Sequence, residues 1–150
     1  MLNEVLRDGE FNAIMKNHTK DLIRYLLEKD LEFGVLAKSE YLEFNPKLPK
    51  EITKSFGEFV MFIIANYTLE SAYIEGDNFI FEAGFGSENI ESVVTVPIES
   101  IFQITINNNP IFVNLSATIK KEIKDSSVKN SMEALLSNPE NLKLLKKKKK

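Results

Sequence analysis

The chain has no cysteine and only one histidine, and each shortage excludes a class of chemistry. Without cysteine it can form no disulfide, no thiolate metal site and no cysteine nucleophile. The single histidine, His18, has no second histidine or cysteine with which to build a zinc site. We therefore predict no metal and no other cofactor.

Long apolar runs are also missing. The longest run, from Phe59 to Ala65, falls far short of the ~20 residues that cross a bilayer. The first residues, M-L-N-E-V-L-R-D, are too acidic and too weakly apolar for a signal peptide. We expect a cytoplasmic protein with no membrane partner.

Basic residues are absent from the middle of the chain. Residues 55–119 contain eight acidic residues and no lysine or arginine, a net charge of −8, whereas residues 1–54 carry −1 and residues 120–150 carry +6. The middle block would repel nucleic acid, so we predict no specific nucleic-acid partner. The same acidic residues are also explained by an ordinary solvated surface.

Motifs of the common enzyme classes do not occur either. The chain lacks G-x-x-x-x-G-K-[ST] and G-x-S-x-G, and Gly84-Phe85-Gly86 lacks the third glycine and the helix of a dinucleotide-binding loop. We predict that the protein is not an enzyme and has no catalytic residues.

What the chain does contain is one domain's worth of apolar residues, 43% of 150. An apolar stripe of Leu22, Ile23, Leu26 and Leu27 predicts a helix that begins at Thr19, a suitable N-cap. Short strands follow, and their close spacing favours a small barrel or sandwich, so the predicted class is α+β, with an N-terminal helix before a small, partly open β-barrel. The predicted strands are Phe33–Ala37, Tyr41–Phe44, Phe59–Ala65, Ala72–Glu75, Phe79–Phe85, Val93–Val96, Ile101–Ile106 and Ile111–Leu115.

We predict three parts along the chain, the last of which is set apart by its composition. Residues 1–17 form an N-terminal extension, residues 18–118 the folded domain, and residues 119–150 a lysine-rich tail that we expect to be flexible.

One pair of segments is more specific than the rest. Phe79 to Gly86, F-I-F-E-A-G-F-G, is followed by V-T-V-P at Val94 to Pro97, where the proline marks a strand end. Alone, the two glycines more often mark a bulge or a tight turn than a place where another chain approaches. Together with the apolar strands around them, over roughly Thr19 to Leu115, these segments resemble the SspB (stringent starvation protein B) family, adaptors that hand tagged proteins to the ClpXP protease.

The resemblance implies an SH3- or Sm-like barrel with a peptide-binding groove. Strand alternation lets only half of the implied groove residues face the peptide, and the sequence leaves open which half. The implied groove residues are Phe62, Ile63, Ile64, Ala65, Ala83, Gly84, Phe85, Gly86, Phe112, Val113 and Asn114.

The resemblance also implies a homodimer in which the helix stripe of Leu22, Ile23, Leu26 and Leu27 meets its copy, although packing in the subunit's own core is the simpler explanation of that stripe. At the other end, Leu142, Lys143, Leu144, Leu145 and Lys146 are similar to the family's tail that docks on the N-terminal domain of ClpX. A solubilising lysine end explains the same residues.

One departure from the family bears on specificity. Relatives have an arginine between the alanine and the phenylalanine, and this chain has Gly84. The change removes a bidentate donor for carboxylates. We therefore expect a peptide that is apolar and neutral or basic.

The predicted function is a proteolytic adaptor that binds degron-tagged, ssrA-type peptides and delivers them to ClpXP through its C-terminal tail. The alternative is an acidic secretion-type chaperone that binds an unfolded effector segment. An Sm-like RNA binder would need a basic aromatic face, and the middle of this chain is acidic.

Overall fold

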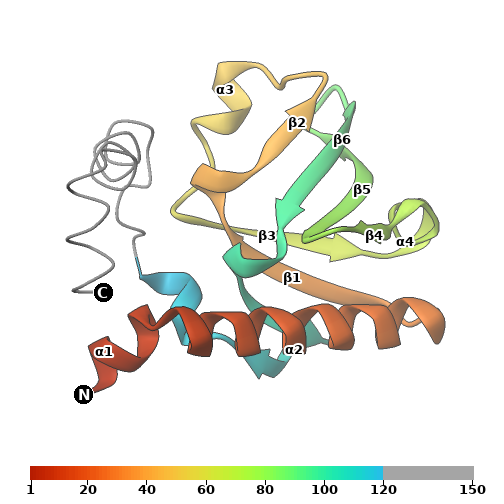
Figure 1. Cartoon of the computed structure of the whole chain (residues 1–150). Coiled ribbons are helices and arrows are strands. Elements are labelled where there is room, and N and C mark those ends of the chain that lie inside the picture. The colour runs from red at the N-terminus through yellow and green to blue at the C-terminus, as the bar shows by residue number, and fades with distance from the viewer. Residues whose placement is uncertain (120–150) are drawn as a thin grey trace, which may run out of the picture. The chain divides into compact units, whose positions relative to one another are not determined.

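In the computed structural model, which describes residues 1–119, the chain begins with two helices that meet at Asp8 (Figure 1). These are α1 (Leu2–Arg7) and α2 (Gly9–Glu28). The Asp8 side chain accepts a hydrogen bond from the backbone N–H of Phe11 at 3.0 Å, and so caps α2.

The predicted helix start at Thr19 is wrong. Thr19 is buried in the middle of α2, where its hydroxyl donates to the carbonyl of Met15 at 2.8 Å. This internal bond satisfies the side chain within the helix, so no helix end is needed there. The same helix crosses the boundary that we placed between residues 17 and 18.

Eight strands form two antiparallel sheets. The strands of the first sheet are, in spatial order, β3 (Phe59–Ile64), β1 (Phe33–Lys38), β7 (Ile101–Ile106) and β8 (Asn109–Val113). The strands of the second sheet are, in spatial order, β2 (Glu43–Asn45), β6 (Ile90–Pro97), β5 (Asn78–Phe85) and β4 (Tyr73–Glu75).

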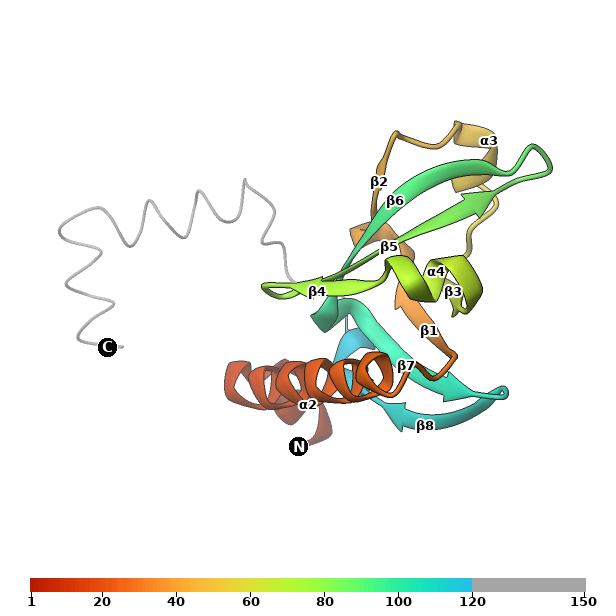
Figure 2. The same ribbon diagram turned by 90° about the vertical axis from the view of Figure 1, so that its right-hand side faces the viewer.

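Short helical segments connect the strands. They are η1 (Ser39–Tyr41), α3 (Lys50–Thr53), α4 (Asn66–Ser71), η2 (Ile98–Ser100) and η3 (Leu115–Thr118). Of these, α4 leads from β3 to β4 and lies against both β3 and β5 (Figure 2).

The core lies between the inner faces of the two sheets and is completed by α2. Strand alternation sends every second side chain inward, and Phe79 and Phe81 of β5 are fully buried there. From α2, Ile23 and Leu26 join the same cluster. The remaining buried members are Phe33, Val35, Ala37, Phe62, Ile64, Val94, Val96, Ile98, Ile101 and Ile104.

The predicted α+β class, with a helix before antiparallel strands, is confirmed. The two sheets of residues 1–119 do not join into a closed barrel. No helix in this part of the chain is long and apolar enough to cross a membrane.

Candidate functional site

The C-terminal half of β5 has one free edge. The partner β4 pairs only with Asn78 to Ile80, whereas β6 pairs with the whole of β5. Residues 81–85 therefore have a strand on one side only. An exposed strand edge presents unpaired N–H and C=O groups that another extended chain can use.

The hydrogen bond of Glu82 shows which groups point to this edge. Its backbone N–H donates to the hydroxyl of Ser71, in α4, at 2.9 Å. The amide of Glu82 therefore points away from β6, and because such directions alternate along an antiparallel strand, the N–H and C=O of Gly84 point the same way. Ser71 therefore already binds the N–H of Glu82 at this edge. The N–H and C=O of Gly84 are the next backbone groups along the strand that point to the free side.

A second free edge belongs to β3. This strand is at the margin of the first sheet and pairs only with β1. It is an apolar strand, F-V-M-F-I-I, without the charged residue or proline that often protects an edge. We call the free edge of β3 and the free edge of residues 81–85 together the open edge.

Phenylalanine rings connect the two halves of the open edge from the inside. Phe62 of β3 lies 5.2 Å from Phe81 and 6.3 Å from Phe85, measured between ring centroids. Phe85 continues outward to Phe44 at 5.5 Å and to Phe56 at 6.4 Å. Such edge-to-face and tilted pairs stabilise by burial and ring geometry. Phe62 and Phe81 are buried, so the half-buried Phe85 is the ring that offers apolar surface beside residues 81–85.

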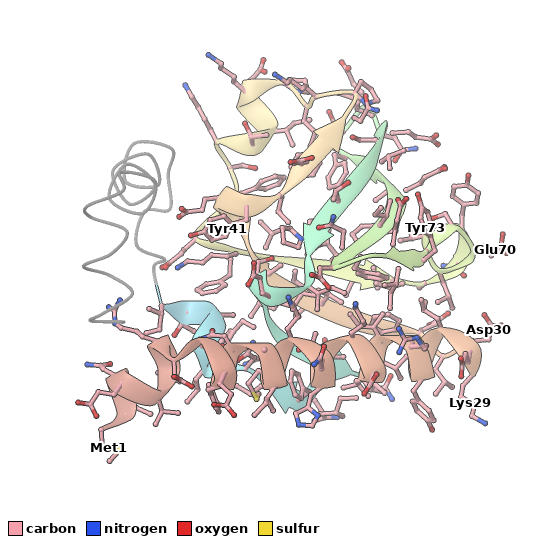
Figure 3. All side chains as sticks on the ribbon, in the orientation of Figure 1. Met1, Lys29, Asp30, Tyr41, Glu70 and Tyr73 are labelled. Carbon is pink, nitrogen blue, oxygen red and sulfur yellow. The ribbon has the colours of Figure 1, made fainter. Side chains whose placement is uncertain are left out.

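The opposite side of residues 81–85 is acidic. Glu82 accepts a hydrogen bond from the hydroxyl of Tyr67, the second residue of α4. That bond and the charge of Glu82 raise the pKa of Tyr67, and slight desolvation and the charges of Glu91 and Glu70 act in the same direction. Figure 3 shows Glu70 and Tyr73 projecting outward around α4 and β4.

Within residues 1–119, no ion pair neutralises these carboxylates. Residues 55–119 contain no lysine or arginine. The ion pairs within residues 1–119 involve Asp77, Asp21 and Glu58, and none involves Glu70, Glu82 or Glu91. The acidic side of the open edge is thus suited to a positively charged group.

The structure explains both glycines of the β5 end by contacts within the chain. A Cβ on Gly84 would overlap the carboxamide of Asn89, which lies over that residue. Gly86 has a φ of +76°, and a Cβ there would lie 2.9 Å from Cδ1 of Ile52. Where we expected an approaching chain to meet Gly84, the protein's own Asn89 already touches it.

The other predicted β3 residues divide by alternation. Phe62 and Ile64 face the core, whereas Ile63 lies on the outer face and is 63% exposed. Ala65 is the residue before α4, and it ends the strand.

Three of the predicted groove residues, Phe112, Val113 and Asn114, do not lie next to β3. Phe112 and Val113 lie in β8, which two strands separate from β3. Asn114 is 1% exposed and accepts hydrogen bonds from the N–H and hydroxyl of Ser116, so it caps η3. The expectation that these three residues line the groove together with Phe62 to Ala65 is corrected by the strand order.

The predicted dimer stripe is divided in a similar way. Ile23 and Leu26 are 0% and 1% exposed inside the subunit's own core, because they pack against both sheets. They have no surface to offer another subunit. Leu22 and Leu27 are only partly buried and remain available to a partner.

Two further predictions concern the docking tail and metal binding. Leu142, Lys143, Leu144, Leu145 and Lys146, the predicted ClpX-docking residues, lie outside the described residues. Within residues 1–119, no three histidine, aspartate or glutamate side chains gather as metal ligands would.

Sequence reasoning missed Tyr67, Ser71 and Asn89, the polar side chains around the β5 end. The only local signal is the turn composition of Ser87-Glu88-Asn89, since asparagine tolerates the positive φ of 50° found at Asn89. No family model matches this chain, and no curated protein or solved structure matches it.

Proposed function

We propose that this protein is a proteolytic adaptor, similar to the SspB family, with an SH3- or Sm-like barrel that binds a tagged, ssrA-type peptide at the open edge. The observation that carries the proposal is the free edge of residues 81–85, where the N–H and C=O of Gly84 point away from β6 and the half-buried Phe85 follows. An extended peptide added to such an edge gains affinity from main-chain hydrogen bonds and selectivity from alternate side chains.

Delivery in this proposal requires a second attachment. Leu142 to Lys146 would dock on the N-terminal domain of ClpX, and Leu22 and Leu27 would contribute to a homodimer. Two weak attachments give high effective concentration of cargo at the protease without any chemistry, and the cargo can leave when it is pulled. Cytoplasmic location and the absence of catalysis belong to the same proposal.

A pull-down separates the two attachments. Immobilised N-terminal domain of ClpX should retain the full chain and lose a chain truncated after residue 140. An ssrA-type peptide should bind both forms equally. Retention of the truncated chain would refute the docking role of the tail.

The peptide site is tested separately by amide chemical shifts. Titration with the same peptide should move the amide signals of Glu82 and Gly84. The amide of Val113, in β8 at the far margin of the first sheet, is the control and should stay in place. Shifts at Val113 without shifts at Gly84 would place the site elsewhere.

A second candidate, the secretion-type chaperone, is favoured by the outer face of the first sheet. Met61, Ile63 and Val113 are 41%, 63% and 42% exposed there. Exposed apolar residues on one face are typical of a surface that binds another protein. A chaperone would bind a segment of several tens of residues much more tightly than any of its short fragments, whereas an adaptor would bind the short tag alone.

A further inference from the structure

The open edge has two chemically different sides, and this difference restricts the peptide that fits it. We propose that the bound peptide alternates lysine or arginine with apolar residues along its extended length. The inference rests on the proposed function and names the class of peptide that the site takes.

The backbone geometry fixes how a peptide would lie. Gly84 directs its N–H and C=O to the free side, and the neighbouring Glu82 N–H is already bonded to Ser71. Gly86, with a φ of +76°, turns the chain away from strand geometry. A peptide strand therefore pairs around Gly84, between α4 at one end and the Gly86 turn at the other.

An added strand shares the two faces of the strand that it pairs with. Along β5, Phe81, Ala83 and Phe85 face the core side, whereas Glu82 and Gly84 face the opposite side. Side chains of paired strands lie over the same face, so alternate residues of the peptide meet alternate surroundings. One half of the peptide side chains lies beside the half-buried Phe85, and the other half lies beside Glu82.

The acidic side is suited to a long cation. Glu91 is paired directly opposite Gly84, and Glu82 is the next residue on the same face. The carboxamide of Asn89 occupies the space where a Cβ of Gly84 would stand, and its oxygen is an additional acceptor on this side. A lysine or arginine opposite Gly84 therefore has carboxylate and amide oxygens within its reach.

The raised pKa of Tyr67 agrees with a negative electrostatic potential on this side of β5. Its pKa is raised through its hydrogen bond with Glu82 and by the charges of Glu82, Glu91 and Glu70, all acting together. A cation that binds here would pair with carboxylates that form no ion pair within residues 1–119. An acidic peptide would add like charge and bind weakly.

Three synthetic peptides of equal length test the alternation. The first is (Lys-Val)3, the second has the same composition in blocks, Lys-Lys-Lys-Val-Val-Val, and the third is (Glu-Val)3. Binding to the full chain is measured by calorimetry at low salt. We expect the alternating lysine peptide to bind about tenfold more tightly than the other two, because two modest ion pairs correspond to roughly that factor.

Charge-neutralising variants show which carboxylates bind the lysine side chains of the peptide. Glu82→Gln and Glu91→Gln should each weaken binding of (Lys-Val)3 severalfold and leave the blocked peptide unchanged. Glu75→Gln removes the same charge about 20 Å away along the sheet, opposite Asn78, and is the matched control. Glutamine keeps an acceptor for Tyr67, so the fold is preserved.

The outcomes separate this inference from the proposed function. Equal binding of the alternating and blocked peptides, or preference for (Glu-Val)3 or an acidic ssrA-type tag, overturns the alternation and leaves peptide binding intact. Failure of every peptide to bind overturns both.

Discussion

The carboxamide of Asn89 lies over Gly84, in the space where a Cβ on that glycine would stand. Asn89 is the last residue of the turn between β5 and β6, and its N–H bonds to the carbonyl of Gly86 at 3.0 Å. The turn can therefore hold Asn89 in this place only because residue 84 has no side chain.

Gly84→Ala should lower the free energy of unfolding by about 1 kcal/mol, because the new methyl group displaces the Asn89 side chain. Urea denaturation measures the change. Adding Asn89→Gly, which removes the carboxamide and suits the positive φ at that residue, should recover most of the loss. Gly9→Ala is the control, since nothing lies within 4 Å of its Cβ position. Equal stability of Gly84→Ala and the unchanged protein would contradict the contact.

Gly86→Ala should destabilise the protein more than Gly76→Ala. Both residues have positive φ, at 76° and 63°, so each alanine costs about 1 kcal/mol or more in backbone strain. Only the Cβ at residue 86 meets a neighbour, Cδ1 of Ile52 at 2.9 Å. Ile52→Val removes that atom and should reduce the difference between the two alanine variants. An unchanged difference would show that Ile52 is not its cause.

Much of the strand pattern could be predicted because it is local. The predicted strands Ile101–Ile106 and Phe79–Phe85 agree with β7 and β5 to within one residue. Each is an apolar run bounded by turn residues, and burial on a sheet face produces that pattern directly.

Other features depend on tertiary contacts that leave no local pattern. The start of α2 was missed because Thr19 resembles a cap while it bonds internally to Met15. The open edge could not be predicted because nothing within residues 81–85 indicates that β4 pairs only as far as Ile80. The strand order that places β8, with Phe112, two strands away from β3 is likewise a property of the whole sheet.

Tyr67 should titrate above the ordinary tyrosine pKa of 10.0. Its hydroxyl donates to Glu82, and that bond, with the surrounding carboxylates, raises its pKa above the ordinary 10.0. Glu82→Gln removes the charge of Glu82 and leaves only a neutral hydrogen-bond acceptor, so the pKa of Tyr67 should move back toward 10.0. Phenolate absorbance measures this, and Tyr67→Phe identifies which of the 4 tyrosines is the late one. A late transition that survives in Tyr67→Phe would belong to another tyrosine.

Asp77 should make stability depend on pH in the acid range. Hydrogen bonds from Lys20 at 3.0 Å and Lys16 at 3.1 Å lower its pKa below the ordinary 3.8, and they connect α2 to the turn between β4 and β5. Because the folded-state pKa is lowered, the contribution is complete above 3.8 and is lost as the pH falls through the folded-state value. Asp77→Asn should therefore cost less than about 1 kcal/mol at neutral pH, since both pairs are exposed, and nothing once the carboxyl is protonated. Urea denaturation from pH 2 to 7 measures the difference, and Asp21→Asn, which removes an exposed pair within α2 alone, is the control. A difference between Asp77→Asn and the unchanged protein that stayed constant down to pH 2 would mean that charge pairing is not the contribution of Asp77.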